Sequence, residues 1–66
     1  MQIVLNGEPR DVSDSTTVRA LLCELHLDKS AIAVAVNRTF VPRSEHVTHR
    51  LAAGDEVELL APMQGG

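Results

Sequence analysis

Hydrophobic and polar residues alternate over the first positions of the chain. Ile3 and Leu5 fall on one side of an extended segment and the residues around them fall on the other, which is the period-two pattern of a half-buried β-strand. Asn6-Gly7 follows, and both residue types tolerate the positive φ of a type I′ turn. We therefore expect a β-hairpin, with Pro9 placing the returning strand at a sheet edge because proline has no N–H to donate.

A helical period begins after a polar cluster at residues 14–17, which is rich in the residue types that cap helix N-termini. At about 100° per residue, four aliphatic side chains fall in one stripe. They are Val18, Leu21, Leu22 and Leu25. The pattern predicts a helix over residues 18–27 whose apolar side packs on a sheet.

Three later apolar segments have the length and composition of strands. They cover residues 31–36, 39–41 and 56–60, and turns at Asn37-Arg38 and Gly54-Asp55 precede the last two. Alternation in the last segment places Val57 on the inward side together with Leu59. Residues 43–50 are polar, and we expect irregular turns with a short 3₁₀ piece there.

This order of elements, β-β-α-β-β-β, predicts an α+β fold. One helix would lie across one face of a mixed sheet of about five strands, a two-layer arrangement. If the first and last strands pair, they run in parallel, with the helix inside a right-handed crossover. This is the β-grasp arrangement of ubiquitin-like proteins. We expect one domain at residues 1–61 and a flexible C-terminal diglycine tail at residues 62–66.

The composition describes a small domain with a modest acidic excess. Nine Asp and Glu residues stand against six Lys and Arg residues among 66, giving a net charge of −3, and the basic residues are spread singly. With Phe40 as the only aromatic residue, nothing favours a nucleic-acid partner. A chain of this length has no room for a deep catalytic cleft, and it contains no phosphate-binding loop or nucleophile–base motif. We therefore expect a protein that is not an enzyme.

Sequence signals favour the cytoplasm. Cys23 is the only cysteine, so no disulfide can form within the chain, which fits a reducing compartment. The sequence shows no signal peptide, transmembrane run or lipidation signal, so we expect no membrane partner.

The histidines and the cysteine offer little support for metal or redox chemistry. His46 and His49 are three positions apart, but a metal site needs further ligands. We therefore expect solvated histidines in a polar loop and no metal site. Cys23 falls about 150° from the leucine stripe, which predicts partial exposure, and no neighbouring residue argues for a reactive thiolate.

Five residues near the predicted last strand and the tail are candidate contacts with a protein partner. They are Met63, Leu60, Phe40, Glu56 and Glu58. The two glutamates can meet basic residues of a partner, and solvation alone is the alternative. If Ala33 and Ala35 share an outward sheet face with the apolar candidates, that face would suit a protein partner.

The sequence ends in Gly65-Gly66, directly after an apolar strand. A segment without Cβ atoms is thin and can pass through a narrow channel. We expect Gly65 to let the tail thread into another protein's active site and Gly66 to present its α-carboxylate there. The alternative is a frayed terminus without a function.

A terminal carboxylate at Gly66 becomes reactive only when one oxygen is converted into a good leaving group. Transfer of AMP from ATP does this most simply. A sulfur nucleophile can then displace AMP and leave a thiocarboxylate, which is anionic near neutral pH and nucleophilic in the way a thiolate is. The chain would thereby carry activated sulfur without releasing sulfide.

Three segments, residues 36–43 (VNRTFVPR), residues 51–60 (LAAGDEVELL) and Gly65-Gly66, together resemble the ThiS family. These are ubiquitin-like sulfur carriers of thiamin biosynthesis, and the likeness spans essentially the whole chain. Asn37 and the segment 41–43 point most narrowly to this family, whereas the terminal glycines and the Gly-Asp turn are shared with its relatives.

The resemblance implies a cycle with three partners and no cofactor bound to this chain. A ThiF-like adenylyltransferase would consume ATP to activate Gly66, and a sulfur-relay protein would supply persulfide sulfur. A ThiG-like thiazole synthase would then accept the thiocarboxylate sulfur into the thiazole ring.

Three alternatives remain open from the sequence. The small subunit of molybdopterin synthase has the same fold and tail chemistry, although those relatives are usually longer and residues 41–43 argue against them. A ubiquitin-like protein modifier would join Gly66 to a lysine through an isopeptide bond. A plain interaction domain would have an inert tail.

Overall fold

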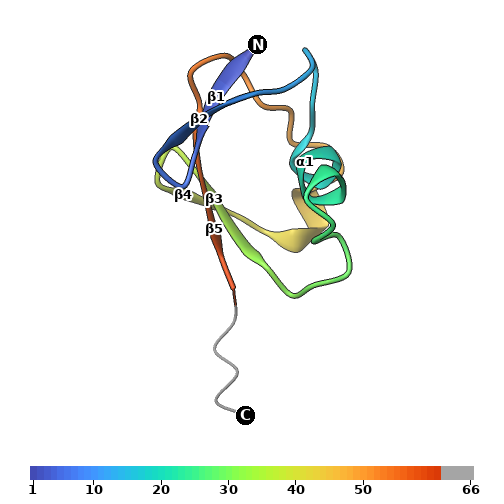
Figure 1. Cartoon of the computed structure of the whole chain (residues 1–66). Helices are drawn as coiled ribbons and strands as arrows, with labels where there is room; N and C mark the ends of the chain where they lie inside the picture. The colour runs from blue at the N-terminus through green and yellow to red at the C-terminus, as the bar shows by residue number, and fades with distance from the viewer. Residues whose placement is uncertain (62–66) are drawn as a thin grey trace.

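The computed structural model describes residues 1–61 as a five-stranded mixed sheet with one α-helix across one face (Figure 1). The elements are β1 (Gln2–Leu5), β2 (Glu8–Asp11), α1 (Val18–Glu24), β3 (Ala33–Val36), β4 (Thr39–Val41), the 3₁₀ helix η1 (Arg43–Glu45) and β5 (Glu56–Leu60). The strands lie in the order β2-β1-β5-β3-β4. This confirms the α+β, β-grasp arrangement expected from the sequence. Among these residues, no helix has the length and apolar character needed to span a bilayer.

The first and last strands lie side by side in the sheet. β1 and β5 pair in parallel with Val4 opposite Glu56, and β5 pairs antiparallel with β3 on its other side. The Val4 N–H donates to the Asp55 carbonyl and the Asn6 N–H donates to the Val57 carbonyl, each at 2.9 Å. The chain between these two parallel strands contains α1, because a parallel pair needs a long crossover connection.

Both tight hairpins turn through two residues with positive φ. The values are 48° and 84° for Asn6 and Gly7 between β1 and β2, and 51° and 68° for Asn37 and Arg38 between β3 and β4. Positive φ at both central residues is the requirement of a type I′ turn. β2, which contains Pro9, lies at an edge of the sheet as expected.

α1 begins at a side-chain cap and packs on the sheet through its apolar stripe. The Thr17 Oγ1 accepts a hydrogen bond from the Ala20 N–H at 3.1 Å, which satisfies one free donor of the first turn. The buried core joins the helix to four of the five strands and to two loop positions. Its members are Ile3, Val12, Val18, Leu21, Leu22, Val34, Val36, Val41, Leu51 and Val57. Burial of each such aliphatic side chain stabilises the fold by about 1.5–3 kcal/mol.

The expected end of α1 at residue 27 is wrong, because the helix ends at Glu24. His26 adopts a φ of 60°, and its N–H donates to the Cys23 carbonyl while the Leu27 N–H donates to the Leu22 carbonyl. These two bonds form a Schellman motif, which closes a helix at a left-handed residue. Leu27 still packs against the core, so the apolar pattern continued past the true helix end.

A polar cluster fixes the start of β5. The Asn37 Nδ2 donates to the Asp55 Oδ1 at 3.0 Å, and the Glu56 N–H donates to the Asn37 Oδ1 at 3.0 Å. The Asp55 Oδ2 accepts from the Ala52 N–H at 2.7 Å. This Asn37–Asp55 cluster ties the β3–β4 turn to β5, so the turn and the strand hold one another in register.

A side chain also supports the far end of β5. β1 ends at Leu5, and beyond it the Asn6 Oδ1 accepts a hydrogen bond from the Leu59 N–H at 2.9 Å. The Asn6 amide therefore takes the place of a strand acceptor. β5 is held on both sides as far as Leu59, two residues before the last described residue, Ala61.

The Asn37–Asp55 cluster and the positive φ of Asn37 predict a graded loss of stability. We expect Asn37→Ala to lower the free energy of unfolding by about 2 kcal/mol, because it removes hydrogen bonds and replaces asparagine, which tolerates the left-handed region, with alanine, which does so less well. Asn37→Gly keeps the conformational freedom and loses only the hydrogen bonds, so about 1 kcal/mol is expected. Urea denaturation of both variants checks this, and equal losses would contradict the role of backbone conformation.

Candidate functional site

The sheet face opposite α1 brings the predicted contact residues together. Ala35 stands opposite Phe40 on β4 and opposite Glu58 on β5, while Ala33 stands opposite Leu60. Directly paired residues point to the same side of a sheet. This surface, called the outer sheet face below, comprises Val4, Ala33, Ala35, Phe40, Glu56, Glu58 and Leu60. The expected common face of the alanines with Phe40 and Leu60 is confirmed.

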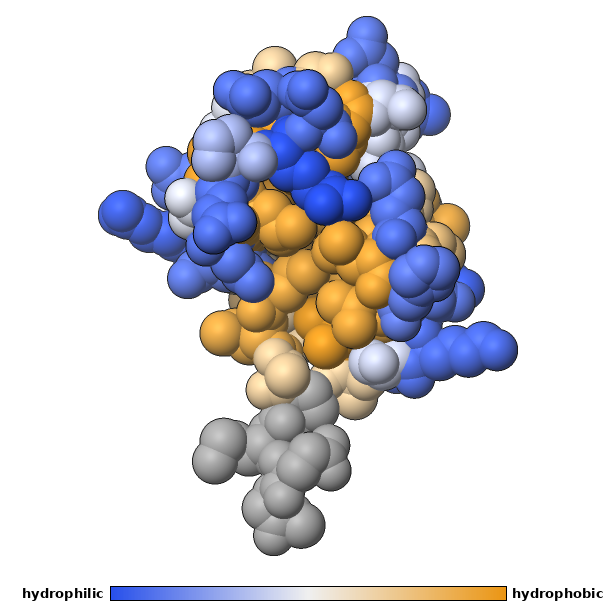
Figure 2. Space-filling model, viewed as in Figure 1, coloured by the Kyte–Doolittle hydropathy of each residue, from blue (hydrophilic) through white to orange (hydrophobic). Residues whose placement is uncertain are grey.

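The outer sheet face exposes large apolar side chains beside small ones. Phe40 is 63% exposed and Leu60 is 58% exposed. Ala33 and Ala35 lie between them on β3, and because their side chains are small the surface is recessed there. Figure 2 views the sheet nearly edge-on, and there apolar surface between the sheet and α1 also extends to the point at which the described chain ends. A surface of this shape can receive a protein partner next to the tail.

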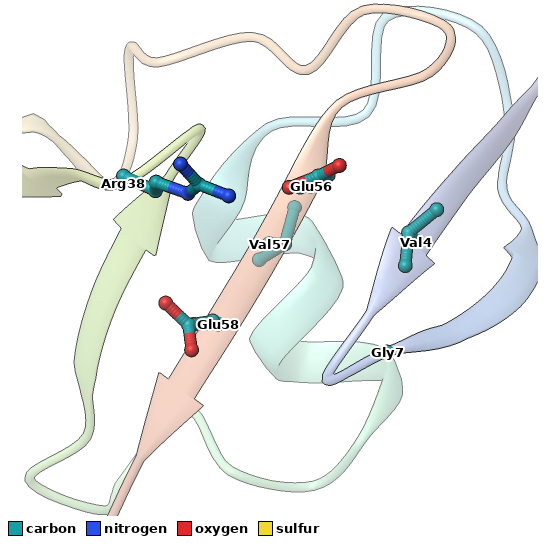
Figure 3. Close-up of a pocket in the computed structure, with 6 residues that line it drawn as sticks. All are labelled: Val4, Gly7, Arg38, Glu56, Val57 and Glu58. Atoms are coloured by element: carbon teal, nitrogen blue, oxygen red, sulfur yellow. The ribbon is translucent and has the colours of Figure 1, made fainter.

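A hollow of about 320 Å³ opens beside the acidic residues of β5. It is lined by Val4, Gly7, Arg38, Glu56, Val57 and Glu58. In Figure 3 the Arg38 side chain extends from the β3–β4 turn toward β5, which bears both glutamates. Among residues 1–61 no ion pair joins Arg38 to either glutamate. This open, mixed-charge surface can bind complementary groups, whereas acid–base catalysis needs a site that excludes water.

The tail candidates lie outside the described residues. Met63, Gly65 and Gly66 all follow Ala61, so the structure does not bear on their contacts or on the threading expected of Gly65. The structure does show where the chain leads into these residues, because Leu60 on the outer sheet face immediately precedes Ala61.

The expectation of solvated histidines is wrong for His46. Its exposed fraction is 6%, and its Nε2 lies 3.2 Å from the Val41 carbonyl oxygen. Because a carbonyl only accepts, Nε2 carries the proton and donates. The segment folds back on the start of α1, where the Arg19 N–H donates to the His46 carbonyl and the Val18 N–H donates to that of His49. His46 is therefore part of the packing, and His49 is half-buried.

Cys23 is exposed on α1, as expected from its helical phase. In the part of the chain that the structure describes, no group of three or more His, Cys, Asp or Glu side chains is arranged to hold a metal ion. Because α1 covers the other face of the sheet, the Cys23 thiol lies on the opposite side of the molecule from the outer sheet face.

Sequence reasoning missed Arg38. It identified residues 37–38 as a turn and assigned no contact to the arginine. The sequence did contain a signal for it, because the two hairpin turns begin with the same residue type, Asn6 and Asn37. Arg38 therefore takes the turn position that Gly7 takes in the first hairpin.

Comparisons with known proteins agree on one family. A family model described as the ThiS family matches residues 3–66. The chain is 32% identical over 66 residues to the sulfur carrier protein ThiS of Escherichia coli, and the alignment covers both chains completely. The crystal structure of a thiamine biosynthesis protein (ThiS) from Geobacter metallireducens superposes with a TM-score of 0.86 at 30% identity, again over the whole of both chains.

A further relative is much longer. The chain is 42% identical over 66 residues to a thiazole synthase of Paramagnetospirillum magneticum, and it spans only 20% of the length of that protein. A segment similar to this chain therefore forms part of a larger polypeptide there.

Proposed function

This chain belongs to the ThiS family and is a sulfur carrier of thiamin biosynthesis, and we propose that it carries the sulfur on Gly66 as a thiocarboxylate. The observation that carries the proposal is the complete alignment with the E. coli sulfur carrier, in which every residue of both chains takes part. Such a carrier is a substrate of other enzymes and is not itself an enzyme.

The proposed loading sequence balances in three steps. A Gly66 carboxylate oxygen attacks the α-phosphorus of ATP, which forms an acyl-adenylate and releases pyrophosphate. The terminal sulfur of a persulfide then attacks the acyl carbon, so a C–S bond forms, the C–O bond to AMP breaks, and AMP leaves. A thiol finally cleaves the resulting acyl disulfide, which becomes reduced to the thiocarboxylate while the thiol is oxidised to a disulfide.

The partners follow from these steps. An adenylyltransferase supplies the ATP-dependent activation, so this chain needs no cofactor of its own. A sulfur-relay protein supplies the persulfide, and a thiazole synthase accepts the sulfur. The longer relative supports the last of these, because a protein named thiazole synthase contains a segment 42% identical to this chain. We propose that the cycle takes place in the cytoplasm, where thiols stay reduced.

An enzyme that acts on Gly66 has to approach the C-terminal end of β5. Gly66 is the fifth residue after Ala61, and an extended chain spans at most about 3.6 Å per residue, so Gly66 reaches roughly 18 Å from Ala61. A bound enzyme therefore comes close to Leu60 and the outer sheet face. We propose that Phe40, Leu60 and Met63 make its apolar contacts, with Glu56 and Glu58 facing basic groups.

Two of the alternatives, a protein modifier and an inert tail, differ from this proposal in what happens to Gly66, whereas a molybdopterin synthase small subunit would share its tail chemistry. A protein modifier would be found joined to lysines of other proteins, and an inert tail would stay unchanged. The full-length relative and the solved structure described above are a sulfur carrier protein ThiS and a thiamine biosynthesis protein (ThiS), and no contact in residues 1–61 favours a modifier or an inert tail.

The proposed carrier role predicts a change in the mass of the protein. Incubation with the adenylyltransferase, ATP and a persulfide donor is expected to replace one oxygen by one sulfur, as measured by intact mass spectrometry. A variant lacking Gly66 should gain no sulfur, because it lacks the proposed acceptor.

Cys23→Ser serves as the matched control, since it removes the exposed thiol and should load normally. Sulfur found on the Gly66-deleted chain, or loss of loading in Cys23→Ser, would contradict the assignment of the carrier atom to Gly66.

The proposed apolar contacts predict a loss of affinity when either exposed side chain is shortened. Phe40→Ser and Leu60→Ser are expected to weaken binding of the adenylyltransferase by about tenfold each, since buried apolar anchors dominate interface energetics. Stability should change little, because both side chains are exposed.

Val47→Ser is the matched control. Val47 is 61% exposed but lies in the loop bonded to the start of α1. Calorimetry on the three variants checks the prediction, and an equal loss of affinity in Val47→Ser would argue against a docking role for the outer sheet face.

A further inference from the structure

Resting on the proposed function, we infer that Arg38, Glu56 and Glu58 form a charged socket for the enzyme that activates the tail. The socket fits a protein surface that presents a basic side chain next to an acidic one. The basic side chain enters between the two glutamates with its aliphatic stem against Val4, and the acidic group pairs with the Arg38 guanidinium.

The first support is the conformation of Arg38. The two hairpin turns have the same form, with φ of 48° and 84° at Asn6-Gly7 and 51° and 68° at Asn37-Arg38. Glycine fits the second position of such a turn without strain, whereas a side chain with a Cβ is disfavoured there. The second hairpin nevertheless holds a bulky residue at this position, and strained residues that persist are concentrated at binding sites.

The second support is that this conformation aims a charge at the outer sheet face. The turn is fixed to β5 by the hydrogen bonds of Asn37 to Asp55 and Glu56, each 3.0 Å. The hollow of about 320 Å³ is lined by Arg38 from the turn, by both glutamates from β5 and by Val4 from β1. Figure 3 shows the guanidinium directed toward β5, which bears both glutamates.

The third support is that these charges are not engaged with one another. The ion pairs within residues 1–61 are Met1 with Asp14 and Arg10 with Glu24. An arginine placed only to offset two glutamates would gain from direct contact with one of them. Here all three charged side chains are free, within the described residues, to meet groups of opposite charge.

The surroundings favour a protein surface over a small ligand. Phe40 lies in the same cross-strand row as Glu58, with Ala35 between them. Leu60 lies farther along β5 toward the tail. The charged socket is thus continuous with the apolar area proposed to receive the adenylyltransferase. Charges at the rim of an apolar contact set association rate and specificity.

The test compares Arg38→Gly, Arg38→Lys and the double variant Glu56→Gln/Glu58→Gln with the wild type. Association of each with the adenylyltransferase is measured by stopped flow at several salt concentrations, together with the melting temperature. We expect about tenfold slower association at low salt for Arg38→Gly and for the double variant, with a weaker dependence on salt. Arg38→Lys keeps the charge and should recover most of the rate.

Stability separates docking from a structural role. The melting temperature of Arg38→Gly should equal or exceed that of the wild type, because glycine relieves the positive φ. Glu45→Gln is the charge control, since Glu45 is exposed on η1 and makes no side-chain hydrogen bond or ion pair within residues 1–61. It should associate like the wild type.

Two results would overturn the socket while leaving the carrier function intact. One is unchanged association of Arg38→Gly and of the double variant with an enzyme that still loads sulfur on the wild type. The other is an equal slowing in Glu45→Gln, which would indicate a general effect of net charge. If the wild-type chain gains no sulfur in the mass measurement, the proposed function itself fails.

Discussion

The parallel pairing of β1 with β5 is the interaction on which the rest of this structure depends. These strands come from opposite ends of the described chain, and because they run in parallel the chain between them has to cross one face of the sheet, where α1 lies. With β5 bonded to β1 on one side and to β3 on the other, the segment that leads to the tail is among the best supported parts of the sheet.

That support has a functional consequence, because a carrier must present a defined end to its enzymes. The start of β5 is tied by Asn37 and Asp55, and its far end by the Asn6 amide. The residues after Ala61 therefore leave from a fixed point beside Leu60. A rigid departure point fixes where an enzyme that acts on Gly66 has to bind relative to the outer sheet face.

The two faces of the sheet have different roles: one forms the buried core and the other is exposed. α1 covers one face and supplies the buried aliphatic core that a small domain needs. The other face stays open, with Phe40 and Leu60 exposed next to the hollow that Arg38 and the glutamates line. Under the proposed function, the domain provides recognition area, and the covalent chemistry at Gly66 takes place in the active sites of the partners.

The sequence alone determined the order of elements, the two hairpin turns and the buried stripe of α1, since each of these depends on neighbouring residues. It also determined the family, through residues 36–43, 51–60 and the terminal glycines. Tertiary structure decided the rest. The end of α1 was set by a Schellman closure, and the burial of His46 by a loop folding back onto the helix. Strand register brought Arg38 and the glutamates of β5 to one hollow. The burial of His46 and the hollow depend on contacts between residues far apart in the chain, and local patterns do not encode which distant backbone will supply a partner or cover a side chain. The Schellman closure is itself local, but Leu27 beyond it still packs against the core, so the apolar pattern did not mark the helix end.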